Sequence, residues 1–239
     1  MLKGTLHLAG LALAGCSLLA AAEISEESAM VDPRLYQQVG AHHDIDPLLL
    51  QAIASVESRE NPYALNVNHE DLHCGSRRET EQALHYIVGR PWVIHLPRGS
   101  IETYVDVEPP ISCALRGHFH DRLWFSSEAD ATTFVDHHGL DSAPQHRNVQ
   151  STDIGLLQIN WYYHGDQVSG ALALLDPAYN LDYAARYLTR LVRKHGVDEA
   201  IGRYHGASSA ARRADYQDRV LATYRGLLRN SGGLMETAR

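Results

Sequence analysis

The chain has 239 residues, and 29 acidic side chains against 21 Lys and Arg give it a formal net charge of −8. Hydrophobic residues at 44% and charged residues at 21% are typical of a globular protein and exclude a disordered one. The acidic balance argues against nucleic acid as a partner, because phosphate binding depends on clustered Lys and Arg, and Lys3 and Lys194 are the only lysines. An acidic polymer would therefore be bound by a shaped groove and not by a general positive field.

Residues 1–22 have the pattern of a secretion signal. Lys3 supplies a positive start, residues 6–19 form an apolar run, and three alanines offer a cleavage site before Glu23. The run is shorter than the roughly 20 residues that a membrane helix needs, so we predict an exported chain without an integral membrane segment once the signal is removed. One alternative stays open: the tetrapeptide Leu-Ala-Gly-Cys that ends at Cys16 resembles a bacterial lipobox, in which the cysteine becomes lipid-anchored.

Two helices are predicted near the mature N-terminus. Residues 33–40 carry apolar side chains at helical spacing. The stronger pattern begins with Asp46, a good N-cap, and Pro47, a favoured first helical residue. Apolar residues then recur at helical spacing until Asn61-Pro62 ends the helix. Glu57 stands on this apolar stripe, so we expect its carboxylate to face the core.

The middle of the chain, residues 67–150, has a different character. Runs rich in β-branched and aromatic residues predict strands at 86–88, 92–95 and 101–107, separated by glycine and proline turn signals. Residues 126–135 have the pattern of a short capped helix. The sequence therefore predicts a small α+β subdomain.

Helix signals return in the last third of the chain. Residues 177–195 carry an apolar stripe and end in a cationic turn followed by Gly196. Two further helices are predicted at 197–204 and 209–228, the second with an apolar residue at every fourth position. Residues 229–239 are predicted to be a flexible tail. The fold class is thus predominantly α, with an inserted small α+β segment.

Cys74 and Cys113 are an even pair in a chain predicted to reach an oxidising compartment, so we expect one disulfide between them. Two unpaired buried thiols are the alternative. Histidines that follow the second cysteine suggest zinc, but short histidine pairs in polar stretches are more often surface residues, and no metal is predicted. These histidines are His118, His120, His137 and His138.

Glu57 is the most informative single residue. Burial of an ionised carboxylate costs several kcal/mol, so such a group is either paired or held partly protonated at a raised pKa. A protonated carboxylic acid near neutral pH is what cleavage of a glycosidic bond needs at its leaving oxygen. The pattern alone favours the structural alternative, a glutamate at the edge of the stripe or in a salt bridge.

Four short segments occur in a fixed order, with predicted helices between them. They are Glu57-Ser58 with Asn61-Pro62 and Ala64, then Gly155-Leu156-Leu157-Gln158-Ile159-Asn160, then Asp176-Pro177 with Asn180-Leu181 and Tyr187-Leu188, and last Arg203-Tyr204-His205-Gly206. Together they resemble the lytic transglycosylases with a goose-lysozyme-like fold. The resemblance covers about half of the chain. It departs from the family pattern where Ala184 replaces glycine and His205-Gly206 replaces Asn-Ala.

The resemblance implies a lysozyme-like helical catalytic domain that is discontinuous, formed by residues 31–66 and 151–228, with residues 67–150 inserted beside its groove. It implies cleavage of peptidoglycan glycan strands in the periplasm, with 1,6-anhydromuramic ends and no cofactor. Within the family, the segments most resemble those of transglycosylases that accompany conjugation and secretion machines. An envelope-spanning complex is therefore an expected partner.

The resemblance also implies roles for single residues. Glu57 stands at the position of the catalytic acid, Ser58, Gln158 and Asn160 would line the substrate groove, and Tyr204 would orient Glu57 by a hydrogen bond. The structural alternatives are a Gln158 side chain that caps local backbone and an ordinary half-buried Tyr204.

Two other functions remain open. Asp153 is the candidate second carboxylate: if it held a water opposite the sugar, the enzyme would be an inverting muramidase, whereas a turn residue that caps backbone amides is the structural alternative. A glycan-binding component without catalysis is the other reading. A metallopeptidase is disfavoured, because none of the predicted helices carries a His-x-x-x-His pair. Trp92, Trp124, Phe125 and Trp161 are either sugar-stacking platforms or core residues.

Overall fold

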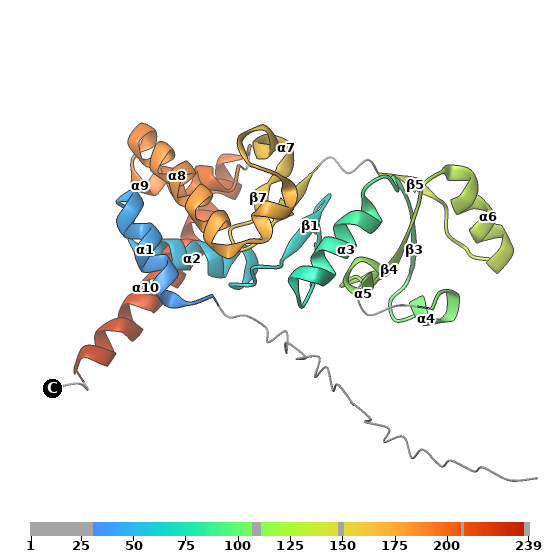
Figure 1. Ribbon diagram of the computed structural model, residues 1–239, viewed down its shortest axis with the longest axis horizontal. Helices are drawn as coiled ribbons and strands as arrows, with labels where there is room; N and C mark the ends of the chain where they lie inside the picture. Colours follow the sequence, from blue (N-terminus) through green and yellow to red (C-terminus); the bar gives the residue numbers. More distant parts are fainter. Residues whose placement is uncertain (1–30, 107–110, 148–150, 207, 237–239) are drawn as a thin grey trace, which may run out of the picture.

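The computed structural model describes residues 31–106, 111–147, 151–206 and 208–236. The expected signal peptide and the lipidation alternative at Cys16 lie outside these residues. The described chain is predominantly helical with two small antiparallel sheets, which confirms the predominantly α fold class (Figure 1). None of the helices in these ranges combines the length with the apolar composition that a bilayer crossing demands.

Most of the helices gather at one end of the molecule (Figure 1). There α2 packs against α1 and α10, and α8 packs against α1 and α9. Their apolar faces form the main core, in which Leu50, Ile53 and Leu188 are almost fully buried. The elements of this half are α1 (Pro33–His43), α2 (Pro47–Ser58), α7 (Trp161–His164), the 3-10 turns η2 (Gly165–Gln167) and η3 (Ala171–Leu175), α8 (Pro177–His195), α9 (Val197–Tyr204) and α10 (Ala210–Glu236).

Three of these helices begin with the same two residues, an aspartate followed by proline. Asp32, Asp46 and Asp176 are the N-caps, and each carboxylate accepts a backbone N–H two or three residues further on. The proline that follows has its φ already fixed near the helical value and has no N–H to leave unpaired. The predicted starts at residues 33, 47 and 177 are confirmed.

The end of the last helix differs from the prediction. α10 continues to Glu236, so the flexible tail expected from residue 229 is wrong over most of its length. No proline interrupts this stretch, and once a helix has formed, each further residue adds a hydrogen bond at little cost. Residues 237–239 lie outside the described part of the chain.

The segment between residues 67 and 150 occupies the other end (Figure 1). Its sheet has the order β4-β3-β5, and its own apolar cluster includes Ile94, Leu123 and Ala131. The elements are α3 (Arg77–Ile87), β3 (Trp92–Pro97), α4 (Ile101–Tyr104), α5 (Ser112–Leu115), β4 (His120–Phe125), α6 (Glu128–His138) and β5 (Gln145–His146).

Two of the predicted elements in this segment are confirmed and two are wrong. The strand at 92–95 is part of β3, and the helix at 126–135 is α6. The strand expected at 86–88 is instead the end of α3, a helix capped by the Ser76 hydroxyl. The strand expected at 101–107 begins as the helical turn α4, because the carboxylate of buried Asp121 accepts the backbone N–H of Ile101.

A four-stranded sheet with the order β2-β1-β6-β7 lies between the two ends. Its strands are β1 (Leu65–Val67), β2 (Glu70–Leu72), β6 (Thr152–Ile154) and β7 (Ile159–Asn160). β1 pairs antiparallel with β6, with Leu65 opposite Ile154. The chain therefore leaves the helical half through β1 and returns to it through β6. The division into a catalytic domain and an insert stays a prediction.

Candidate active site

Glu57 lies in the last turn of α2, at the edge of the main core. Its side chain is only 12% exposed. The hydroxyl of Tyr216, from α10, donates a hydrogen bond to Glu57 Oε1 over 2.6 Å. α2 and α10 pack against each other, so the bond to the carboxylate lies beside this contact between helices.

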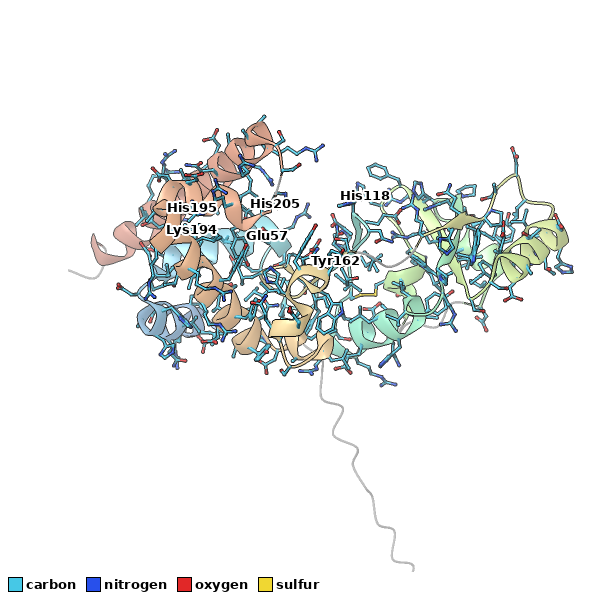
Figure 2. The ribbon with its side chains drawn as sticks, turned by 90° about the horizontal axis from the view of Figure 1, so that it is seen from above. Glu57, His118, Tyr162, Lys194, His195 and His205 are labelled. Atoms are coloured by element: carbon cyan, nitrogen blue, oxygen red, sulfur yellow. A yellow bond between two sulfur atoms is a disulfide. The ribbon has the colours of Figure 1, made fainter. Side chains whose placement is uncertain are left out.

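His205 stands beside the same carboxylate (Figure 2). Its Nδ1 is 3.9 Å from Glu57 Oε1. The imidazole stacks on the ring of Tyr216, with 4.7 Å between centroids and 6° between planes. Burial, with Arg219 and Arg212 nearby, lowers the pKa of His205, so near neutral pH the ring is neutral and does not form an ion pair with Glu57.

Burial raises the pKa of Glu57 from 4.5 to about 7. The hydrogen bond from Tyr216 opposes this shift, the charge of Asp153 adds to it, and Arg219 opposes it. The partial negative charge at the C-terminal end of α2 acts in the same direction as burial. The sequence-based expectation of a buried carboxylate with a raised pKa is therefore met, and Glu57 is poised to exchange a proton near neutral pH.

The loop from Gly155 to Gln158 packs on the end of α2, where the Ser58 hydroxyl donates to the Leu156 carbonyl. Gly155 has φ +80°, and a Cβ there would lie 2.3 Å from the carbonyl oxygen of Leu174, so only glycine fits. Fully buried Asn180, from α8, accepts the N–H of Leu157 and donates to the carbonyls of Ile154 and Leu174. Gly155 and Asn180 belong to two of the sequence segments that resemble the family, and they hold the same backbone loop in place.

Ser58 and Gln158 line the same cavity as Glu57. The Ser58 hydroxyl donates to the carbonyl of Leu156, 2.7 Å away, and the Gln158 amide donates to the carbonyls of Ala64 and Gly155. Gln158 therefore caps backbone, the structural alternative considered for it, although it also borders the cavity. Their expected roles in substrate binding stay predictions.

Tyr204 does not hold Glu57 by a hydrogen bond, so that expectation is wrong. Its hydroxyl donates instead to the carbonyl of Leu157, 2.9 Å away, and Tyr216 makes the bond to Glu57. The sequence marked Tyr216 only as one residue of a helical apolar stripe. No local signal identifies it, because the bond joins residues 159 positions apart.

Asp153 and Asn160 lie outside the lining of this cavity. Asp153 is in β6, paired with Asn66 and Asn160, so the turn expected at this position is wrong. The Asn160 amide donates to Asp153 Oδ1 over 2.7 Å, and burial raises the pKa of Asp153. Asn160 also caps α7. The two residues face each other in neighbouring strands of the four-stranded sheet.

The cavity has a volume of about 440 Å³ and is bordered by both ends of the molecule. One wall carries Glu57, and His118 lies on the opposite wall (Figure 2). The residues on that second wall come from the β1–β2 hairpin and the residue after it, from the turn before β4 and from the start of β4. They are His69, Glu70, Asp71, Leu72, His73, Gly117, His118, Phe119, His120 and Arg122.

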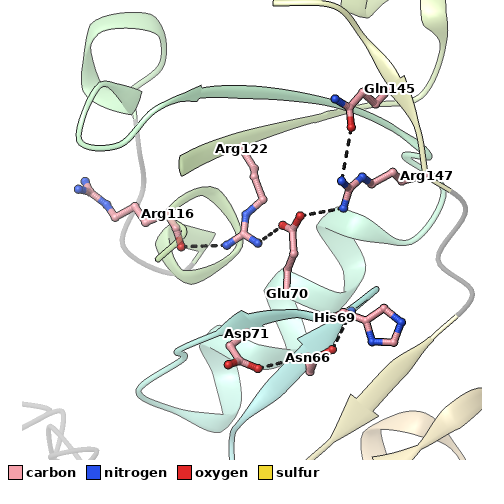
Figure 3. A network of polar contacts seen from close by, with 8 residues as sticks. All are labelled: Asn66, His69, Glu70, Asp71, Arg116, Arg122, Gln145 and Arg147. Atoms are coloured by element: carbon pink, nitrogen blue, oxygen red, sulfur yellow. Dashed lines mark hydrogen bonds and ion pairs between the residues drawn. The ribbon is translucent and has the colours of Figure 1, made fainter. Parts of the chain in front are cut away.

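Glu70 ties the hairpin to the sheet of the 67–150 segment (Figure 3). Its carboxylate forms ion pairs with Arg122, which is buried, and with Arg147, at 2.8 Å. Arg122 also donates to the carbonyl of Arg116. Breaking such a buried pair leaves an uncompensated charge, so these contacts hold the second wall in place.

Two groups among the described residues bring metal-type ligands together. Ligand atoms of Glu70, His95 and His120 lie within 4.8 Å of one another, and both ring nitrogens of His95 are buried without a hydrogen-bond partner there. The two guanidinium groups on Glu70 oppose a cation at this place. The other group is His42, His43 and Asp182. Of the remaining histidines considered for zinc, His118 is exposed on the cavity wall, and His137 and His138 are exposed at the end of α6.

The disulfide predicted between Cys74 and Cys113 is present. It connects the chain after β2 to α5. The aromatic residues considered as sugar platforms are core residues: Trp124 is buried, Trp92 and Phe125 pack on the smaller apolar cluster, and Trp161 packs on the main core.

Comparisons of the chain with protein-family models, curated proteins and solved structures find no match. The functional assignment is therefore based on the residues and their geometry.

Proposed function

We propose that this protein is a lytic transglycosylase that cleaves the β-1,4 bond between N-acetylmuramic acid and N-acetylglucosamine. One observation carries the proposal: a buried carboxylate, Glu57, with a pKa of about 7 borders a cavity between two walls. Near neutral pH such a group both gives and takes a proton readily. The order of the sequence segments that resemble the family adds to this support.

In the proposed reaction, Glu57 first protonates the bridging oxygen as the bond from this oxygen to C1 of the muramic sugar breaks. The muramic 6-hydroxyl oxygen then attacks C1, and its proton passes to the Glu57 carboxylate. The ring closes as a 1,6-anhydro sugar, the acid is restored and no water is consumed. The Tyr216 hydroxyl, 2.6 Å from Oε1, would stabilise the carboxylate between the two steps.

A muramidase would need a second free carboxylate that holds a water. Asp153 is engaged by Asn160 and lies outside the cavity lining. The other carboxylates of the lining are Glu70, which pairs with two arginines, and Asp71, which accepts a hydrogen bond from Asn66. These contacts favour the single-carboxylate reaction over hydrolysis.

A glycan-binding protein without catalysis is the other candidate. Such a scaffold has no need of a buried acid, which destabilises the fold wherever it ionises. We further propose that the enzyme acts in the periplasm on glycan strands, as a component of an envelope-spanning conjugation or secretion complex.

The test is digestion of purified peptidoglycan by the chain that begins at Glu23. We expect release of 1,6-anhydromuropeptides, and loss of release in Glu57→Gln with an unchanged circular dichroism spectrum. Glu60→Gln is the matched control, because Glu60 lies three residues further on and bonds to Ser55, outside the cavity. Reducing muramic ends would show a hydrolase, and binding of glycan without release by the wild type would show a binding protein.

A further inference from the structure

Phe119 has the most exposed large apolar side chain of the described residues, at 77%. It borders the same cavity as Glu57, on the wall formed by the 67–150 segment. Isolated apolar side chains on a convex surface are ordinary, whereas an aromatic ring in a concave site is typical of ligand binding. Phe119 is also absent from both apolar clusters, so no packing role accounts for it.

The turn that carries Phe119 is held in place. A Cβ at Gly117 would lie 2.0 Å from the carbonyl oxygen of His120, so the turn closes too tightly for any other residue. Arg122 lies beneath it and donates to the carbonyl of Arg116 while it pairs with Glu70 (Figure 3). The ring is therefore presented to the cavity by a fixed support.

The surroundings of the ring are polar. His118 packs edge-on against Phe119, with 4.7 Å between ring centroids, and His120 follows on the same wall. On the other side, the exposed guanidinium of Arg59 borders the cavity. An apolar face bordered by hydrogen-bonding groups matches a pyranose ring, which has apolar C–H faces and a rim of hydroxyl and amide groups. It does not match a purely apolar ligand.

We propose that Phe119 is a sugar-binding platform, on which an N-acetylhexosamine ring of the glycan strand stacks while a neighbouring bond lies at Glu57. The proposal rests on the proposed function and adds a subsite on the 67–150 segment, outside the helical half. An aromatic side chain suits this role because it supplies rigid contact area with only two side-chain torsions to fix. The 67–150 segment would thus add affinity for the glycan strand and take no part in bond cleavage.

The test is binding of soluble, peptide-free glycan strands to the Glu57→Gln chain, measured by titration calorimetry. We expect Phe119→Ala to weaken binding about tenfold and Phe119→Trp to keep it within about threefold, because tryptophan retains the stacking face. Tyr163→Ala is the matched control, since Tyr163 is 70% exposed but outside the cavity lining. Its affinity should equal that of the parent.

In the chain with Glu57 intact, Phe119→Ala should raise KM for the same strands about tenfold and leave kcat unchanged. Equal affinity of the alanine and parent chains would overturn the platform, even if anhydro products confirm the transglycosylase. Conversely, if the wild type releases no product and Phe119→Ala still weakens glycan binding, the platform stands and the proposed function fails. Loss of affinity in Phe119→Trp as well as Phe119→Ala would also count against stacking.

Discussion

Glu57 keeps its proton at a pH where an exposed glutamate has lost it, because only 12% of its side chain is exposed to water. Tyr216 limits the shift by donating to the ionised form. The two effects bring the pKa to about 7, where the acid and base forms are both populated. A proton donor that must recover its proton in the next step needs this balance.

The raised pKa predicts a pH-dependent effect of Glu57→Gln on stability. Between its ordinary pKa of 4.5 and about 7, Glu57 binds more protons in the folded than in the unfolded chain. Stabilisation by the protonated group is therefore complete at low pH and is lost as the pH rises through about 7. From about pH 4 to about pH 8, the variant should gain roughly 3 kcal/mol of unfolding free energy relative to the wild type.

Urea unfolding of both proteins at the two pH values measures this difference. Because the unfolded-state carboxyl is ordinary, the comparison isolates the folded environment of Glu57. A stability difference that is the same at both pH values would show that Glu57 has an ordinary pKa in the fold.

Tyr216→Phe should move the pH profile of the enzyme. The Tyr216 hydroxyl lowers the pKa of Glu57, so its removal should shift the alkaline limb of kcat/KM to higher pH. Tyr204→Phe is the control, because the Tyr204 hydroxyl bonds to the Leu157 carbonyl and not to Glu57. An unchanged limb in Tyr216→Phe, or an equal shift in both variants, would contradict this assignment.

At the scale of elements, the loop from Gly155 to Gln158 depends on one side chain of α8. Asn180 satisfies one backbone N–H and two carbonyls in a site without water access. Asn180→Ala should therefore lower the unfolding free energy by about 3 kcal/mol, since buried backbone groups lose their partners. Lys194→Ala, an exposed change on the same helix, should stay within about 0.5 kcal/mol. Similar midpoints in urea for the two variants would refute this role of Asn180.

The elements that the sequence predicts correctly have local signals. The aspartate–proline pairs at Asp46 and Asp176 cap their helices through bonds to backbone N–H groups two or three residues further on, so local sequence is enough to predict them. The sequence does not predict α3, although Ser76 and Glu79 form a capping-box pattern. The β-branched and aromatic residues near its end favour a strand, whereas the Ser76 cap and the packing of Ile87 in the main core stabilise a helix.

The candidate site is predictable only in part, because local sequence patterns mark some of its residues and not others. Glu57 is marked by its place on an apolar stripe, and Gln158 follows the tight glycine loop. Tyr216 and the second wall are joined to Glu57 by contacts between distant parts of the chain. Such contacts leave no periodic trace in the sequence. Phe119 likewise has the pattern of an ordinary strand-flanking residue until the fold places it in the cavity.

At the scale of the whole molecule, Glu70 holds the second wall of the cavity in place through its pairs with Arg122 and Arg147. Glu70→Gln would leave Arg122, which is 2% exposed, without its charged partner. We expect a loss of about 3 kcal/mol in unfolding free energy. Glu102→Gln breaks the exposed ion pair with Arg116 and should have a much smaller effect, because water screens that pair. Equal effects of the two variants in urea would show that the Glu70 network does not hold the second wall.

The central claim is that one carboxylate cleaves the glycan without water. Digestion of peptidoglycan in water enriched in the heavy oxygen isotope tests it most directly, by the mass of the released muropeptides. The proposed reaction predicts muramic ends that lack one water and carry no heavy oxygen, because the 6-hydroxyl of the sugar itself attacks C1. Muramic ends that carry one heavy oxygen at C1 would contradict it and show hydrolysis.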